Sequence, residues 1–274
     1  ARPDPLWNYT TGIEIGISSL LSWWAYLGAM IRMAPDGRNV AVPVMVGMGA
    51  PVPLLSLIGI AGVLVLKVSD PSEWLRTVGG PVYAVIALSF VAAANLGTAI
   101  AGIYSSAVGL RNFAALERLS WSSVLIITVL PVALVGILIP ELFFARFGVF
   151  LALIGVAFAP LCGIQIADYY LLRRGRIDIR GIFARGAQGS YAFWRGVNPA
   201  ALVAMVCGCA LYAWLLNPLT YESHGPFRWL TASLPSAAMA GAVHVLLTRW
   251  FVLPRGRGGY AGPSSLESNQ GVAN

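Results

Sequence analysis

The sequence predicts an all-α membrane protein with seven transmembrane helices. Hydrophobic residues make up 58% of the 274 residues and charged residues only 11%, whereas soluble domains carry about 25% charged residues. The mean hydropathy is +0.75. A bilayer core about 30 Å thick needs about 20 apolar residues per helix. Seven runs reach that length: 12–31, 40–66, 81–106, 120–139, 147–172, 197–216 and 229–253.

The positions of the basic residues predict the orientation. Thirteen of the 18 lie after the first, third, fifth and seventh runs: Arg32, Arg38, Arg111, Arg118, Arg173, Arg174, Arg176, Arg180, Arg185, Arg195, Arg249, Arg255 and Arg257. The other side holds Arg2, Lys67, Arg76, Arg146 and Arg228. Because positively charged loops remain in the cytoplasm, we expect an external N-terminus and a cytoplasmic C-terminus. The protein is then a multi-pass protein of the inner or plasma membrane, with the lipid bilayer as its surroundings.

Two regions are expected along the chain. Residues 1–253 form the transmembrane domain, and residues 254–274, rich in Gly, Ser and Asn, form a disordered cytoplasmic tail because they cannot bury enough apolar surface to become ordered. An external start at Ala1 without a signal-peptide pattern predicts that further N-terminal helices are missing. The odd number of spans points the same way, because two equal repeats need an even number.

Several functional classes are disfavoured. The basic residues lie in separate loops without interleaved aromatic residues, which argues against nucleic-acid binding. No Ser/His/Asp set, HExxH motif or glycine-rich phosphate loop is present, so we expect no enzyme and no cofactor. Cys207 and Cys209 would point to nearly opposite helix faces and make no metal site.

The first run carries polar and aromatic residues that could line a cavity. Trp23 and Trp24 point about 100° apart on a helix, so at most one faces a given cavity. Either could face lipid, or could form a plate on which a flat ring stacks. Ser22 lies in the same helix. Glu14, near its start, could contact the outer headgroups or serve a gating or proton-linked role.

The third run has small residues at helical spacing, including Gly102, which allow close approach of helices. By itself this pattern is equally well explained as a packing face. Asn95 and Thr98 lie three apart on one face and bring an amide and a hydroxyl into the membrane without a charge. Because polar groups at that depth are costly and tend to be functional or mutually bonded, these residues favour a neutral, hydrogen-bonding substrate.

The fifth run ends at a membrane surface. Tyr169 and Tyr170 suit the interfacial belt, and arginines follow. Gln165 and Asp168 are polar where lipid would disfavour them. Asp168 could pair with a nearby arginine, cap a neighbouring helix, or take part in coupling or an inner gate.

Four segments resemble one transporter family. The segment CGIQIADYYLLRRGRIDIRGIF (162–183) resembles the cytoplasmic end of the tenth helix in the nucleobase:cation symporters, the permeases for cytosine, purines, uracil, allantoin, hydantoin and thiamine-related rings. SWWAYLGAMIRMAP (22–35) resembles the sixth helix, ANLGTAIAGIYSSAVGL (94–110) the eighth, and NPAAL (198–202) the start of the eleventh. The seven runs would then correspond to helices six to twelve of a twelve-helix protein.

The resemblance implies part of a five-plus-five inverted-repeat fold, similar to that of the leucine transporter. In such proteins helices one and six are broken near the midplane and line the substrate site with helices three and eight. It implies that Trp23, or else Trp24, stacks on the heterocycle. Asn95 would hydrogen-bond the ring edge, Thr98 would support substrate or sodium, and Gly102 matches one register of a later family Asn.

The predicted function is therefore cation-coupled symport of a nucleobase or related nitrogen heterocycle by alternating access. The coupling ion is left open between Na⁺, with Thr98 as a candidate ligand, and H⁺. The candidates for coupling or gating are Ser22, Glu14, Gln165 and Asp168. The alternatives are a seven-helix receptor or sensor, and a membrane subunit that transports nothing.

Overall fold

The structure is a computed structural model in which helices and connecting loops make up the described part of the chain. It describes residues 4–31, 34, 39–68, 71–113, 116–177, 181, 191, 193–194 and 196–260. The chain divides into two compact units, which are described separately. Unit 1 comprises Ala1–Trp24 and Glu141–Asn274, and unit 2 comprises Ala25–Pro140.

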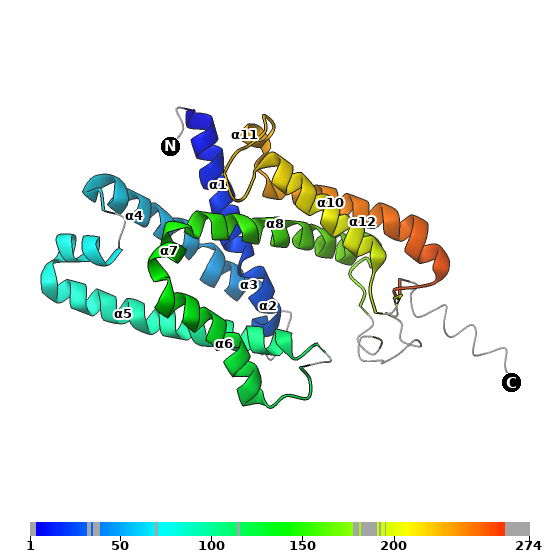
Figure 1. The fold of residues 1–274 in the computed structure, drawn as a ribbon, viewed down its shortest axis with the longest axis horizontal. Coiled ribbons are helices and arrows are strands. Elements are labelled where there is room, and N and C mark those ends of the chain that lie inside the picture. Colours follow the sequence, from blue (N-terminus) through cyan, green and yellow to red (C-terminus); the bar gives the residue numbers. More distant parts are fainter. Residues whose placement is uncertain are drawn as a thin grey trace. The chain divides into compact units, whose positions relative to one another are not determined.

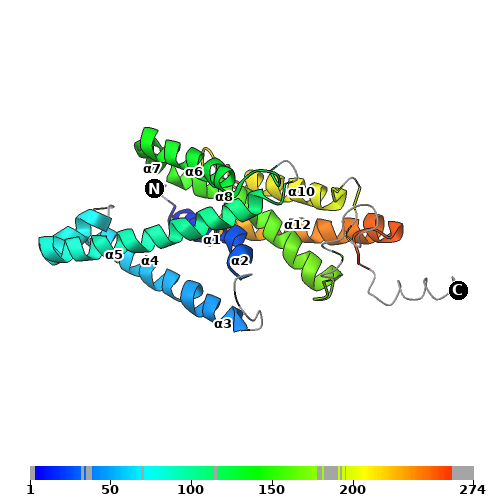
Figure 2. The same ribbon diagram turned by 90° about the horizontal axis from the view of Figure 1, so that it is seen from below.

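Unit 1 is a helical bundle. Helices α8, α10 and α12 pack against one another, and α1 packs against α8 (Figures 1 and 2). Its elements are α1 (Pro5–Leu21), α7 (Pro140–Ala145), α8 (Phe147–Ile166), the π-helix η3 (Ala167–Leu172), α10 (Pro199–Leu215), α11 (Phe227–Leu230), α12 (Ser233–Leu247), the π-helix η4 (Thr248–Val252) and the 3₁₀-helix η5 (Leu253–Arg255).

Capping residues determine where two of these helices begin. The Asp4 carboxylate accepts hydrogen bonds from the backbone N–H groups of Leu6 (3.1 Å) and Trp7 (3.3 Å) at the start of α1. The Asn198 side chain does the same for Ala200 (3.1 Å) and Ala201 at the start of α10. A proline follows each cap, at the position where a missing N–H costs nothing.

Unit 2 contains the remaining apolar helices, and α5 is kinked. Gly80 has φ 70° and Pro81 follows it, so the helical hydrogen bonding is interrupted there. The span predicted for 81–106 begins directly after this kink. The elements are α2 (Trp24–Ile31), α3 (Ala41–Val44), the π-helix η2 (Met45–Gly49), α4 (Pro51–Leu66), α5 (Pro71–Leu110) and α6 (Trp121–Leu138).

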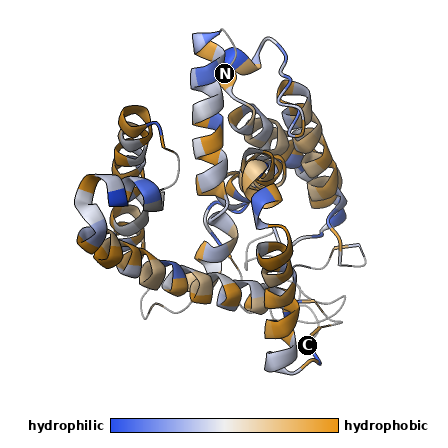
Figure 3. Cartoon of the chain, turned by 60° about the vertical axis from the view of Figure 1, so that its left-hand side comes forward, coloured by the Kyte–Doolittle hydropathy of each residue, from blue (hydrophilic) through white to orange (hydrophobic). Residues whose placement is uncertain are grey.

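Among the described residues, five helices are long and apolar enough to cross a membrane. They are Ala41–Leu66, Glu73–Leu110, Trp121–Leu138, Phe147–Leu172 and Ser233–Arg255. Figure 3 shows hydrophobic residues along most helices, with hydrophilic residues mainly towards helix ends and loops. Together with the composition, these helices make the chain an integral, multi-pass membrane protein.

Two predicted runs differ from these five. The run 12–31 is divided into α1 and α2 by a turn at Ser22–Trp23. Its apolar length does not show this turn, whereas the resemblance to a broken sixth helix implies an interruption in this run. The run 197–216 is helical but only 17 residues long, from Pro199 to Leu215. The predicted tail begins at Pro254; the structure describes it as far as Tyr260, and 261–274 lie outside the described residues. Arg2, Arg32, Arg38, Arg180, Arg185 and Arg195 also lie outside them.

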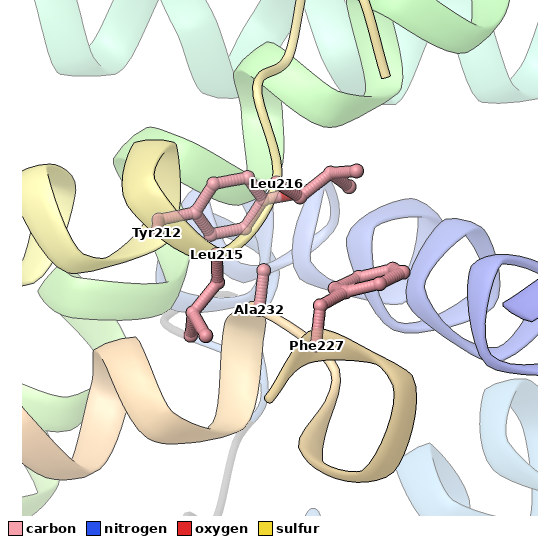
Figure 4. Close-up of a cluster of buried hydrophobic side chains, with 5 residues drawn as sticks. All are labelled: Tyr212, Leu215, Leu216, Phe227 and Ala232. Atoms are coloured by element: carbon pink, nitrogen blue, oxygen red, sulfur yellow. The ribbon is translucent and has the colours of Figure 1, made fainter. Parts of the chain in front are cut away.

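A cluster of buried side chains lies where α10 meets α11 and the start of α12. It comprises Tyr212, Leu215, Leu216, Phe227 and Ala232 (Figure 4). Trp7 of α1 packs against this cluster, and its ring nitrogen donates to the Ser223 hydroxyl (2.7 Å). The cluster therefore holds α1, which carries the buried carboxylate described below, against the bundle.

Candidate functional site

The turn between α1 and α2 carries the predicted aromatic residues. The Ser22 hydroxyl donates to the Ser19 carbonyl (2.6 Å), and the Trp23 N–H donates to the Leu20 carbonyl (3.1 Å). Serine hydroxyls that bond nearby carbonyls compete with helical hydrogen bonds, which favours an interruption at this position. Trp23 and Trp24 are half-buried, and both lie at the break.

Trp24 contacts a second predicted residue. Its indole N–H donates to the Gln165 side-chain oxygen on α8 (2.5 Å). The structure thus brings together a residue expected to bind substrate and one expected to act at a gate. The bond fixes the Trp24 ring against α8.

Glu14 is buried in unit 1 and accepts five hydrogen bonds. Its Oε2 accepts from the N–H groups of Ala232 (2.8 Å) and Ser233 (3.0 Å) at the start of α12. Its Oε1 accepts from the hydroxyls of Ser233 (2.5 Å), Tyr212 (2.9 Å) and Ser18 (3.4 Å). These donors and the positive end of α12 stabilise a buried negative charge. Glu14 thereby joins α1, α10 and α12 and does not reach the outer surface.

Asp168 lies in η3 and is the centre of a second polar cluster. Its Oδ2 accepts from Arg173 Nε (2.6 Å), and its Oδ1 accepts from the Tyr260 hydroxyl (2.7 Å). The same Oδ1 lies 3.3 Å from Nε2 of the buried His244 on α12. Burial, and then the bond to Asp168, raise the pKa of Tyr260, which keeps that hydroxyl a donor.

A cavity of about 450 Å³ opens beside the Asp168 cluster. Its lining includes Gln165, Asp168, Tyr169, Tyr191, Asn198 and Tyr260. The two polar residues singled out in the fifth predicted run therefore line one cavity, at the end of the helices that is rich in arginine.

Asn95, Thr98 and Gly102 lie on α5 of unit 2. The side chains of Asn95 and Thr98 are exposed, and Gly102 is half-exposed. The Thr98 hydroxyl donates to the Ala94 carbonyl of its own helix (3.1 Å). Within the described residues no group of three His, Cys, Asp or Glu side chains is arranged to hold a metal ion. Sodium binding at Thr98 stays a prediction. The ligands of a sodium ion there would be hydroxyl and carbonyl oxygens, so the absence of a His, Cys, Asp or Glu group does not bear on it.

Four residues of these clusters were not predicted from the sequence. Tyr212 and Ser233 bond Glu14, and His244 and Tyr260 contact Asp168. The available signal was weak, since a tyrosine or histidine in an apolar run more often serves packing. His224, for comparison, stacks on Trp214 in a loop, with ring centroids 4.9 Å apart.

Comparison with known proteins places these features in a family. The profile described as "Permease for cytosine/purines, uracil, thiamine, allantoin" matches residues 10–243. The chain is similar to a hydantoin permease of Microbacterium maritypicum, with 39% identity over 113 residues. It is also similar to an allantoin permease of Bacillus subtilis (31% over 62 residues) and a purine-uracil permease of Arabidopsis thaliana (39% over 49 residues).

These matches cover limited parts of the proteins. They span 38%, 23% and 18% of this chain, and 22%, 12% and 8% of the three relatives, respectively. The chain thus covers well under two thirds of their length. No solved structure matches it significantly.

Proposed function

Because the chain belongs to the family of permeases for cytosine/purines, uracil, thiamine and allantoin, we propose that it takes part in cation-coupled uptake of a nucleobase or related nitrogen heterocycle. Transport would proceed by alternating access. The observation that carries this proposal is the family match across residues 10–243, which includes the broken helix with tryptophans at its break. The permeases named above and a thiamine transporter of Saccharomyces cerevisiae support ring-shaped substrates.

The interrupted helix is the local feature that suits a substrate site. In transporters with inverted repeats, discontinuous helices leave backbone groups unpaired near the membrane midplane, where they can bind substrate and ion. The turn at Ser22–Trp23 is an interruption of this kind in an otherwise apolar segment. We propose that the chain supplies helices six to twelve of that fold, with seven spans and a cytoplasmic C-terminus.

Residue roles follow from the bonds at the break. Both tryptophans lie at the break. Trp23 is the first candidate for stacking on the heterocycle, and Trp24, which bonds Gln165, is the second. Asn95 has a donor and an acceptor for the ring edge, as a neutral heterocycle requires. Thr98 would support the substrate or a sodium ion, with Gly102 beside it. The coupling ion would be Na⁺ or H⁺.

Uptake by cells that produce the protein tests the proposal. A panel of labelled hydantoin, allantoin, uracil, cytosine and thiamine should show saturable uptake of at least one compound. The substitution Trp23→Ala should reduce that uptake by about tenfold or more, since stacking on an aromatic ring contributes about 1–3 kcal/mol. Trp23→Phe should retain part of it, because a ring remains.

Trp229→Ala is the matched control, because Trp229 is 73% exposed and lies in α11, away from the break. Surface labelling should show equal amounts of each variant in the membrane. If no compound of the panel is taken up above background, the proposed function is wrong. If the Trp23→Ala variant transports as well as the Trp229→Ala variant, the proposed role of Trp23 is wrong.

A further inference from the structure

Three segments meet at the arginine-rich end of unit 1. The Arg173 side chain, at the end of η3, donates to the Gly258 carbonyl (3.0 Å). Tyr260 bonds Asp168 of η3, and Trp194, which precedes α10, packs on Phe251 of η4 with ring centroids 5.1 Å apart. The ends of α8, α10 and α12 and the segment after α12 therefore form one connected surface.

Exposed arginines on this surface have no acidic partner among the described residues. They are Arg174, Arg176, Arg249, Arg255 and Arg257, which we call the inner arginine surface. Asp168 is the one carboxylate in the described part of this end, and its oxygens already bond Arg173 and Tyr260 and face His244. Within the described residues, the surface thus has a strong positive charge that no carboxylate neutralises.

Some of these side chains are held in place by neighbouring groups. Arg255 donates to the Phe251 carbonyl (2.9 Å) and lies over the Phe251 ring at 3.9 Å. Arg257 lies over the Trp194 ring at 5.1 Å. Positive charge alone is enough to retain a loop in the cytoplasm. Guanidinium groups that are already held in position lose less conformational freedom when they bind a ligand, so the fixed positions of these side chains favour a binding role.

The surroundings indicate where the ligand would lie. Trp250 is 77% exposed and Tyr170 is 65% exposed, and both are next to arginine-bearing segments. Tryptophan and tyrosine favour the headgroup level of a bilayer, so the arginines lie at that level too. A nucleic acid would leave these aromatic side chains in water, whereas lipid headgroups and their acyl chains accommodate both kinds of residue.

We propose that the inner arginine surface binds the phosphate of an anionic phospholipid headgroup. Arginine bonds phosphate oxygens through two parallel N–H groups, and the exposed aromatic residues would contact the glycerol and upper acyl chains. This inference does not depend on which solute is transported.

Lipid titration of the purified chain in mild detergent tests the proposal. Bound lipid is counted by native mass spectrometry during titration with phosphatidylglycerol, phosphatidylcholine or inorganic phosphate. We expect phosphatidylglycerol to bind at least tenfold more tightly than phosphatidylcholine, and its affinity to fall as salt is added. Inorganic phosphate at the same concentration should not compete.

The variant Arg249→Gln/Arg255→Gln/Arg257→Gln should bind phosphatidylglycerol more weakly by on the order of a hundredfold, because each arginine near an anionic surface contributes severalfold. The control Arg146→Gln/Arg228→Gln removes arginines at the opposite end of unit 1 and should bind as the unchanged chain does. If the triple variant does not fold, as judged by circular dichroism, Arg174→Gln/Arg176→Gln takes its place.

Three outcomes would overturn the proposal. The two lipids could bind equally well, which would mean that headgroup charge is not recognised. The folded arginine variants could keep the preference for phosphatidylglycerol, which would place the site elsewhere. Inorganic phosphate could displace the lipid at equal concentration, which would make this a site for a free anion.

Discussion

Glu14 is a buried carboxylate that is stabilised by hydrogen bonds and by the start of a helix. One of its five donors comes from α1 and one from α10. The other three come from Ser233, the first residue of α12, and from Ala232, the residue before it. Charged hydrogen bonds are stronger than neutral ones, and the loss of one partner leaves others buried and unpaired. A predicted coupling role for Glu14 has to be compatible with this structural role.

The substitution Glu14→Gln should lower the thermal unfolding temperature markedly. The amide group would place a donor opposite other donors, at a cost of about 2–3 kcal/mol. Unfolding of the purified chain in detergent, followed by tryptophan fluorescence, measures the effect. Glu73→Gln is the control, since Glu73 is exposed on α5; equal unfolding temperatures for the two variants would show that the Glu14 bonds do not contribute to stability.

At the scale of the element, close approach between α8 and its neighbours depends on glycines. A methyl group on Gly163 would overlap the Ala237 carbonyl of α12, and one on Gly155 would lie 2.5 Å from the hydroxyls of Ser18 and Tyr212. Small residues let membrane helices gain packing and hydrogen bonds that the bilayer does not otherwise favour. α8 therefore meets α1, α10 and α12 through its smallest residues.

Gly163→Ala should destabilise the bundle, because α8 and α12 would have to move apart. We expect a loss of about 1–3 kcal/mol, as for other overpacked sites, seen as a lower unfolding temperature. Gly136→Ala on α6 is the matched control, since a methyl group there meets no atom within 4 Å. Alanine also favours a helix by up to about 1 kcal/mol over glycine, so this control should be neutral or slightly stabilising.

The elements also show which helix bounds the local sequence patterns predict. The fifth predicted run and the observed span coincide at 147–172, because the apolar residues there are uninterrupted and arginines follow. The apolar length of the first run does not show the turn at Ser22–Trp23, and only the resemblance to a broken helix implied an interruption there. The break depends on serine hydroxyls bonding local carbonyls and on packing against α8, which composition does not show.

At the scale of the whole molecule, the charges of the loops predict an orientation. Arg174, Arg176, Arg249, Arg255 and Arg257 lie at one end of unit 1, and Arg146 and Arg228 at the other. Because positively charged loops are retained in the cytoplasm, the inner arginine surface should face the cell interior. The loop between α10 and α11 should then face outward.

Cysteine labelling tests this orientation. In a chain whose three native cysteines are replaced by alanine, Leu219→Cys should react with an impermeant maleimide in intact cells. Arg176→Cys should react only after the membrane is permeabilised. Both positions are exposed, so a difference in reactivity reports the side of the membrane; the reverse pattern would invert the proposed topology.

The sequence by itself determined that this is a multi-pass membrane protein of a permease family, because apolar length and motif residues are local properties of the chain. It also singled out Glu14, Gln165 and Asp168 as polar groups in apolar runs. Only the tertiary structure decided which groups they meet: Trp24 for Gln165, Ser233 for Glu14, and Tyr260 for Asp168. These partners lie 141, 219 and 92 residues away along the chain. Such pairs form when helices pack, and no periodic pattern in the sequence encodes them.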